Sequence, residues 1–138
     1  MRAVEVQIEV PRGSFVKREL GGGVEYLSPV PCPFNYGSLP GVLAADGDFA
    51  DALVLGPRLA VGAHVATTAW LRVRFLDDGA VDDKLICGDR PPSQREIARI
   101  ERFFAVYAVA RTALNLLRGR GAARSFGVAP LLGAGDVE

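Results

Sequence analysis

Residues 64–88, HVATTAWLRVRFLDDGAVDDKLICG, predict a strand, a tight turn and a second strand that runs back along the first. Leu71, Val73 and Phe75 occupy every second position, which is the period of a half-buried strand. The DDG that follows is a tight-turn signal, and KLICG has the composition of a returning strand. This stretch therefore indicates antiparallel pairing.

Further strands are predicted on the N-terminal side of this stretch. VEVQIEV at 4–10 alternates apolar and polar residues, ADALVL at 50–55 is a short apolar run, and ELGGGVEYL at 19–27 is typical of a hairpin around three glycines. Residues 28–41, SPVPCPFNYGSLPG, hold too many prolines and glycines for a regular element and predict an ordered loop.

One long helix is predicted late in the chain. It begins after Ser93, where Glu96 completes a capping box, and ends at Gly119. Apolar residues recur along it at helical spacing: Ile97, Ile100, Phe104, Tyr107, Ala110, Leu114 and Leu117. The Gly- and Ala-rich segment 119–138 predicts a partly flexible tail. Strands followed by a helix indicate a single α+β domain of 138 residues on a small antiparallel sheet or barrel.

Composition limits the partners that the chain is expected to have. Sixteen basic and sixteen acidic residues cancel, so the overall charge favours neither nucleic acid nor an anionic membrane. The sequence shows no signal-peptide pattern and no apolar run long enough to cross a bilayer. Cys32 and Cys87 have no metal-ligand spacing and are expected to be buried in a cytoplasmic protein.

Two acidic clusters stand at strand junctions. ADGDFADALVL at 45–55 crowds three aspartates before a strand, and FLDDGAVDDK at 75–84 holds four more around a turn. Each cluster is compatible with a solvated turn or with a site for a hard cation such as Mg2+. Taken alone, each favours the solvated turn, although the two clusters could face each other.

Five segments carry a family resemblance. IEVPRGSFVKREL, FNYGSLPG, DGDFADALVL, DDGAVDDKL and FFAVY occur in the order and near the spacing of the soluble family I inorganic pyrophosphatases. The resemblance extends from about residue 8 to residue 108. It implies an OB-like, five-stranded β-barrel core with a long C-terminal helix packed against it, and Mg2+-dependent hydrolysis of pyrophosphate, with Mn2+ as a possible substitute. It also allows a homo-oligomer.

The resemblance implies roles for particular residues. Asp48 matches the carboxylate that takes a proton from the attacking water. The acidic residues that match the family's metal ligands are Glu9, Glu19, Asp46, Asp51, Asp77 and Asp82. The groups that match phosphate-binding residues are Lys17, Tyr36, Lys84 and Tyr107.

Plainer explanations exist for several of these residues. Tyr107 lies on the apolar face of the predicted helix and would be assigned to the core without the resemblance. Lys84 has carboxylates close by in the sequence and is able to pair with Asp82 or Asp83. Tyr36 has the setting of a turn aromatic.

The chain departs from the family pattern at two phosphate-binding positions. Tyr26 stands where the family has an arginine, and Ala108 stands where it has a lysine. Candidates to supply the missing charge are Arg18, Arg118 and Arg120. Three functions are consistent with this pattern: a pyrophosphatase of reduced activity, an enzyme of the same fold with another phosphorylated or diphosphate substrate, and a non-catalytic protein that binds metal or a partner.

Overall fold

The computed structural model describes most of the chain. Its described residues are 1–14, 16–18, 24–27, 31–44, 47 and 49–131. Within them, strand β6 (His64–Asp77) pairs antiparallel with four others. Along one edge, β1 (Arg2–Val10) pairs with the first part of β6 and β9 (Ala123–Pro130) with the second part. β8 (Lys84–Gly88) and β7 (Ala80–Val81) pair with the other edge, so the antiparallel pairing predicted from 64–88 is confirmed.

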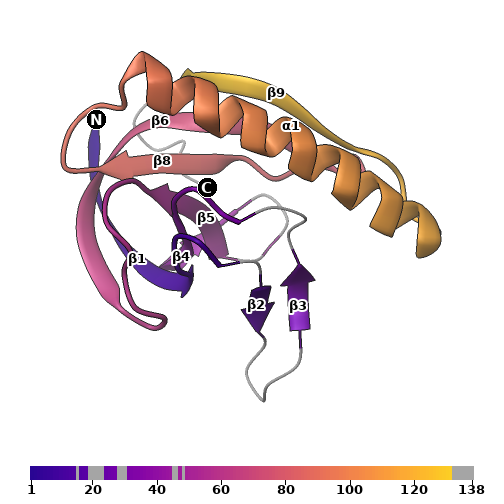
Figure 1. Ribbon diagram of the computed structural model, residues 1–138, viewed down its shortest axis with the longest axis horizontal. Coiled ribbons are helices and arrows are strands. Elements are labelled where there is room, and N and C mark those ends of the chain that lie inside the picture. Colours follow the sequence, from indigo (N-terminus) through magenta and orange to yellow (C-terminus); the bar gives the residue numbers. More distant parts are fainter. Residues whose placement is uncertain (15, 19–23, 28–30, 45–46, 48, 132–138) are drawn as a thin grey trace.

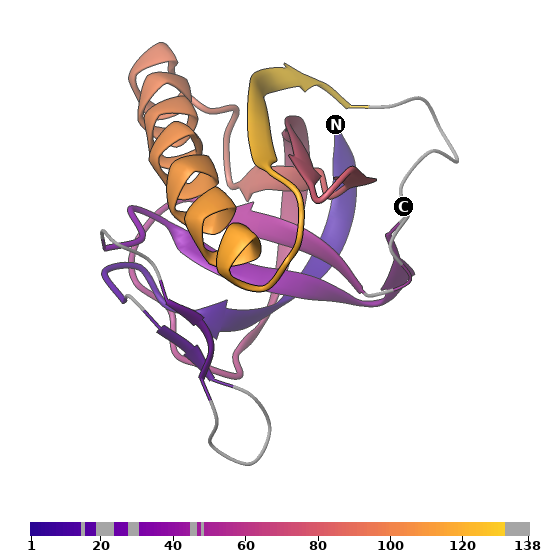
Figure 2. The same cartoon turned by 90° about the vertical axis from the view of Figure 1, so that its right-hand side faces the viewer.

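Five of the described strands close into a barrel. Their order is β1, β4 (Asn35–Leu43), β5 (Phe49–Val54), β8 and β6, and the pairing of β1 with β6 joins the two ends. β5 and β8 run parallel, whereas the other neighbours run antiparallel. Helix α1 (Gln94–Leu117) lies against the outside of the barrel, next to β9 (Figures 1 and 2). The expected α+β fold with an OB-like barrel and a packed helix is confirmed.

Two predicted turns lie between paired strands. Between β6 and β7, Asp78 and Gly79 have φ values of 52° and 79°, as a two-residue hairpin of type I′ requires. β2 (Val16–Arg18) pairs with β3 (Val24–Leu27) on either side of the three glycines, which themselves lie outside the described residues. This small hairpin projects from the barrel on the side away from α1 (Figure 1).

The prediction of a loop over residues 28–41 is wrong in its second half, where β4 begins. The pairing of β4 with β5 is interrupted between Ser38 and Leu43. Pro40 falls inside this interruption, where the ladder needs no N–H donor, so the proline does not exclude a strand.

The segment after residue 119 also contains more structure than its composition suggests. β9 pairs with β6, and its register shifts at a bulge where Gly127 has a φ of 85°. Ala123 is buried under the helix, so small residues serve here for close packing. Residues 132–138 lie outside the described part of the chain.

Helix α1 begins as predicted and buries a slightly different face. Ser93 accepts a hydrogen bond from the backbone N–H of Glu96, and the Glu96 side chain accepts one from the backbone of Ser93, which completes the capping box. The assignment of Leu117 to the apolar face is wrong, because it is 86% exposed. The buried helix residues are Ile100, Phe103, Phe104, Ala108 and Asn115. No helix in the described residues is long and apolar enough to cross a membrane.

Buried apolar residues form two clusters. The first, here called the helix-side core, joins α1 to the barrel and consists of Val10, Cys32, Phe34, Leu53, Val73, Phe75, Ile86, Ile100, Phe103, Phe104, Ala108 and Ala123. The second lies among the barrel strands and consists of Val6, Ile8, Leu39, Ala50, Ala52, Val54, Ala69, Leu85 and Cys87.

The two cysteines belong to these clusters, one to each. Cys32 and Cys87 are free thiols and are buried, as the sequence predicts. Burial raises the pKa of both thiols to about 12. Both therefore remain protonated at neutral pH and serve as small apolar residues.

Phe104 is the side chain on which the packing of α1 is expected to depend most. Its ring lies 5.9 Å from that of Phe34, 6.0 Å from that of Phe75 and 5.2 Å from that of Phe103. Because Phe104→Ala would leave a cavity here, it should lower the free energy of unfolding by about 3–5 kcal/mol in urea titrations. Val109→Ala, at a helix position that is 72% exposed, should stay within about 0.5 kcal/mol. Equal losses for the two variants would contradict this assignment.

Candidate active site

The parallel register of β5 and β8 brings the two acidic clusters together. Asp51 on β5 lies opposite Lys84, the first residue of β8. Asp82 precedes Lys84 by two residues, and Asp77 is the last residue of β6, just before the turn. Side chains from the two clusters therefore meet around Lys84, where the sequence suggested only that the clusters could face each other.

Lys84 is a buried cation between two carboxylates. Its side chain is 2% exposed, and its Nζ lies 2.7 Å from Asp82 Oδ2 and 3.3 Å from Asp51 Oδ2. A buried ammonium is costly unless it is paired, so these carboxylates stabilise it. Of the two pairings that the sequence left open for Lys84, the one with Asp82 is present. Asp83 instead accepts a hydrogen bond from Arg72.

Tyr36 belongs to the same group of residues. It lies half-buried on β4. Burial raises the pKa of Tyr36 well above its ordinary value, and the negative charges of Asp51 and Asp82 raise it further. A hydrogen bond with Asp51 contributes in the same direction. The hydroxyl therefore keeps its proton and remains a hydrogen-bond donor.

Tyr107 is both a packing residue and a member of this group. Its ring lies 5.6 Å from that of Phe75, at the border of the helix-side core. Burial is the main cause that raises the pKa of its hydroxyl, and Arg111 partly opposes the shift. The charges of Asp82 and Asp77 raise this pKa further. The hydroxyl thus lies in the field of the carboxylates and stays protonated.

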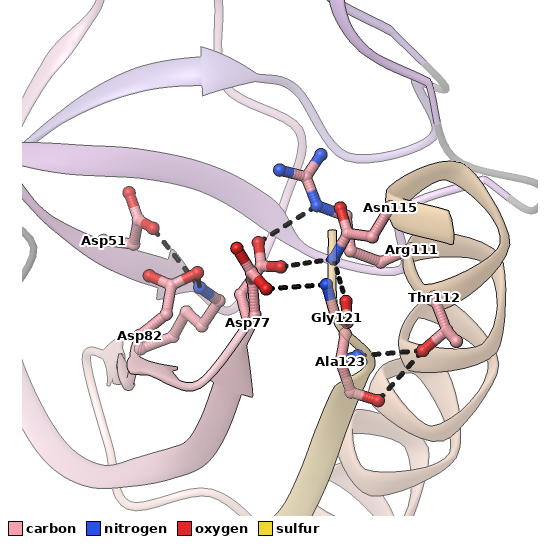
Figure 3. Close-up of polar contacts among 10 residues, drawn as sticks. Asp51, Asp77, Asp82, Arg111, Thr112, Asn115, Gly121 and Ala123 are labelled. Atoms are coloured by element: carbon pink, nitrogen blue, oxygen red, sulfur yellow. Dashed lines mark hydrogen bonds and ion pairs between the residues drawn. The ribbon is translucent and has the colours of Figure 1, made fainter. Parts of the chain in front are cut away.

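Asp77 is held by helix α1 through both of its carboxylate oxygens. Arg111 Nε donates to Asp77 Oδ2 at 3.0 Å, and Asn115 Nδ2 donates to Asp77 Oδ1 at 2.7 Å. In Figure 3, Asp77 lies between Asp51 and Asp82 on one side and Arg111 and Asn115 on the other. The predicted metal ligand at this position is therefore oriented by the helix.

Three further bonds attach the end of α1 to the chain that follows it. Asn115 Nδ2 also donates to Gly121 O at 3.0 Å. Thr112 Oγ1 donates to Ala123 O at 3.1 Å and accepts from Ala123 N at 2.9 Å (Figure 3). The helix that positions Asp77 is thereby attached to the start of β9.

Arg111 and Asn115 are site residues that the sequence interpretation missed. Their contacts to Asp77 span more than thirty residues of chain, which no local pattern reveals. One available signal was the position of Arg111, one helical turn after Tyr107. The arginines proposed from the sequence include Arg118 and Arg120, and both are exposed.

Glu9 lies on β1 at a bulge. The register of β1 with β4 shifts between Ile8 and Val10, so Glu9 is the extra residue there. β1 and β4 approach closely at this point, because a Cβ on Gly37 would come within 2.1 Å of Gln7 O. Only glycine fits at that position, which accounts for the glycine of the NYG motif.

Four predicted site residues have side chains that the structure does not describe. Asp46, Asp48 and Glu19 lie outside the described residues. Lys17 belongs to β2, where it lies opposite Tyr26, and the description of both stops at the backbone.

The described carboxylates have the chemistry that a divalent cation requires. Asp51 and Asp82 are about one-fifth exposed and already have a cation, the Lys84 ammonium, between them. Carboxylate oxygens of this kind suit hard ions such as Mg2+. Within the described residues, no three acidic, histidine or cysteine side chains gather closely enough to hold a metal ion. The residues present fit such an ion as part of a ligand set, to which the resemblance adds Asp46.

Comparisons with known proteins agree with this geometry. The model of the inorganic pyrophosphatase family matches residues 6–123. An inorganic pyrophosphatase of Gluconobacter oxydans is 39% identical in an alignment 92 residues long that covers 61% of this chain and 53% of that protein. A soluble inorganic pyrophosphatase of Oryza sativa subsp. indica is 36% identical in an alignment 121 residues long that covers 72% of this chain and 56% of that protein. The chain thus spans about half the length of the curated relatives it matches.

Solved structures share the architecture. The inorganic pyrophosphatase from Thermus thermophilus has a TM-score of 0.73 at 27% identity, covering 94% of this chain and 83% of that one. The enzyme from Helicobacter pylori has a TM-score of 0.76 at 24% identity, covering 94% and 85% of the two chains, and this likeness concerns the fold alone.

Asn115 should contribute measurably to stability because it is fully buried and has two acceptors. Asn115→Ala removes a donor from the buried side of Asp77 and should lower the free energy of unfolding by about 1–3 kcal/mol in urea titrations. Leu116→Ala, at the next and 64% exposed position, is the matched control and should change little. An Asn115→Ala variant as stable as the control would show that this network does not stabilise the fold.

Proposed function

Because the chain belongs to the inorganic pyrophosphatase family, we propose that it hydrolyses inorganic pyrophosphate to two phosphates with the help of Mg2+. One feature supports this activity most strongly, namely the buried Lys84 ammonium between Asp51 and Asp82. The protonated hydroxyls of Tyr36 and Tyr107 lie in the field of the same carboxylates. Acidic oxygens for cations and neutral or positive donors for phosphate thus belong to one group of side chains.

The substrate explains why such a mixture is useful. Pyrophosphate carries about three to four negative charges near neutral pH, and its hydrolysis adds charge on the attacking and leaving oxygens. Bound Mg2+ would neutralise part of that charge and lower the pKa of the attacking water. Its ligands would be Asp46, Asp51, Asp77 and Asp82, with Glu9 and Glu19 acting through water.

The remaining residues have roles in binding and proton transfer. Water attacks one phosphorus, the bond from that phosphorus to the bridging oxygen breaks, and the bridging oxygen leaves with its electron pair as part of phosphate. Asp48 would accept the proton from the attacking water. Phosphate oxygens would accept hydrogen bonds from Lys17, Lys84, Tyr36 and Tyr107.

Tyr36 and Tyr107 suit this role because of their protonation. Their raised pKa values keep both hydroxyls protonated well above neutral pH. A neutral hydroxyl donates a hydrogen bond to a phosphate oxygen, whereas a phenolate would repel it. A cytoplasmic setting is part of the proposal, since the free thiols Cys32 and Cys87 suit a reducing compartment.

A second candidate function has one specific observation in its favour. The family's phosphate-binding lysine is replaced by Ala108, which is only 6% exposed and packs in the helix-side core. The residue at this position packs in the core, so the site has one cation fewer around the substrate than the family pattern. An organic diphosphate with a smaller charge than pyrophosphate is the alternative substrate class.

Phosphate release from pyrophosphate tests the proposed function directly. With Mg2+ present, the wild-type protein should release phosphate, and Asp48→Asn should lower kcat at least a hundredfold because it removes the proton acceptor. The matched control is Asp89→Asn, at an exposed position outside the site, and should retain wild-type activity. A panel of nucleotides and organic diphosphates should give slower release. Release from one of these but not from pyrophosphate would favour the second candidate.

Metal binding provides a separate test that needs no turnover. In isothermal titrations with Mn2+, Asp51→Asn and Asp82→Asn should each weaken binding at least tenfold, because each removes a charged oxygen ligand. Asp89→Asn should bind Mn2+ like the wild type. Unchanged affinity for Mn2+ in both site variants would mean that the two acidic clusters are solvated turns and not a metal site.

A further inference from the structure

The site retains a second cation on its helix side. Arg111 lies one turn after Tyr107 on α1, and its side chain is 20% exposed. Its Nε lies 3.0 Å from Asp77 Oδ2, so the guanidinium is held at the edge of the group formed by Asp51, Asp77 and Asp82. Neither the family resemblance nor the arginines considered from the sequence point to this residue.

Only part of the Arg111 guanidinium is used in the structure. The bond to Asp77 occupies Nε, and among the described residues the two terminal nitrogens have no hydrogen-bond partner. In Figure 3 these terminal nitrogens point away from the helix. They form a planar fork of N–H donors, whose geometry matches two oxygens of one phosphoryl group.

The surroundings favour the charged form of this side chain. An arginine guanidinium keeps its charge in proteins, and the Asp77 carboxylate, 3.0 Å from its Nε, pairs with that charge. The cation is therefore permanent, and Asp77 restricts its orientation before any ligand arrives.

Ala108 lies in a packed position that leaves little room for a comparable charge. It is 6% exposed and belongs to the helix-side core together with Phe103 and Phe104. A long cationic side chain at 108 would have to displace aromatic packing or extend past it. Arg111 is partly exposed and already reaches the acidic group, so it is the better placed of the two positions on α1.

We propose that Arg111 binds a phosphoryl group of the substrate through its two terminal nitrogens while Nε remains on Asp77, and so supplies the positive charge that is absent at Ala108. This assignment rests on the proposed function for the identity of the substrate. It requires only that the ligand carry a phosphoryl group beside the Asp51, Asp77 and Asp82 carboxylates. Asp77 then acts as a positioning residue for the arginine.

Binding of the non-hydrolysable analogue methylenediphosphonate tests this assignment. In isothermal titrations with Mg2+ present, Arg111→Gln should raise the Kd for the analogue about ten- to a hundredfold, since it removes a charge-assisted contact. Arg111→Lys keeps the positive charge but lacks the planar fork of donors, so its Kd for the analogue should lie between those of the wild type and Arg111→Gln. Arg102→Gln, at an exposed position on the same helix, is the matched control and should bind like the wild type.

Stability measurements separate binding from a purely structural bridge. If the ion pair of Arg111 with Asp77 only stabilises the fold, Arg111→Gln should lower the urea midpoint and leave the Kd of the folded protein for the analogue unchanged. That outcome would overturn the assignment. If Arg111→Gln does not fold, the same comparison applies to Arg111→Lys, for which an unchanged Kd overturns it. In the hydrolysis assay, a raised KM for Arg111→Gln with Mn2+ binding intact supports the assignment.

The outcomes also distinguish this inference from the proposed function. If the wild type hydrolyses pyrophosphate and Arg111→Gln leaves both KM and the analogue Kd unchanged, the assignment of Arg111 fails while the function stands. If the wild type does not hydrolyse pyrophosphate but loses affinity for the analogue on Arg111→Gln, the pyrophosphatase proposal fails and Arg111 remains a phosphoryl-binding residue.

Discussion

The backbone hydrogen bonds between β1 and β6 turn a curved sheet into a closed barrel. In this barrel β5 and β8 are neighbours that run parallel. A simple meander of hairpins cannot produce such a pair. The parallel pair in turn sets Asp51 beside Lys84, although they are far apart in sequence. The position of the buried ammonium between two carboxylates thus follows from this parallel pair within the barrel.

The described part of the site holds two cation–carboxylate groups. Lys84 lies between Asp51 and Asp82, whereas Arg111 lies against Asp77 at the edge of helix α1. The first group depends on strand register and the second on the packing of α1 against the barrel. A change in the helix would therefore be expected to alter the second group and leave the first nearly intact.

Local patterns predicted the elements whose signals lie within a few residues. The alternation through Phe75, the turn at Asp78 and the capping box at Ser93 all appear in the structure. β4 was missed because prolines and glycines argued against a strand, and only its irregular pairing with β5 shows why Pro40 is tolerated. β9 was missed because glycine and alanine suggest flexibility until a neighbouring helix and strand are present to pack against them.

The candidate site was predictable to a similar extent. The resemblance supplied the acidic residues, and sequence proximity suggested the pairing of Lys84 with Asp82, which the structure contains. Neither the resemblance nor sequence proximity could suggest Arg111 or Asn115, because their contacts to Asp77 exist only once α1 has packed on the barrel. The roles of Asp46 and Asp48 remain predictions, since both residues lie outside the described part of the chain.

The length of β6 has a consequence for self-association. β1 pairs with this strand only as far as Ala69, and β9 covers the same edge from Leu71 to Asp77. Without β9, that stretch of backbone would offer free N–H and C=O groups to any passing strand, including one from another copy of the chain. β9 therefore takes up the hydrogen bonds of this stretch within the chain, in addition to packing beside the helix.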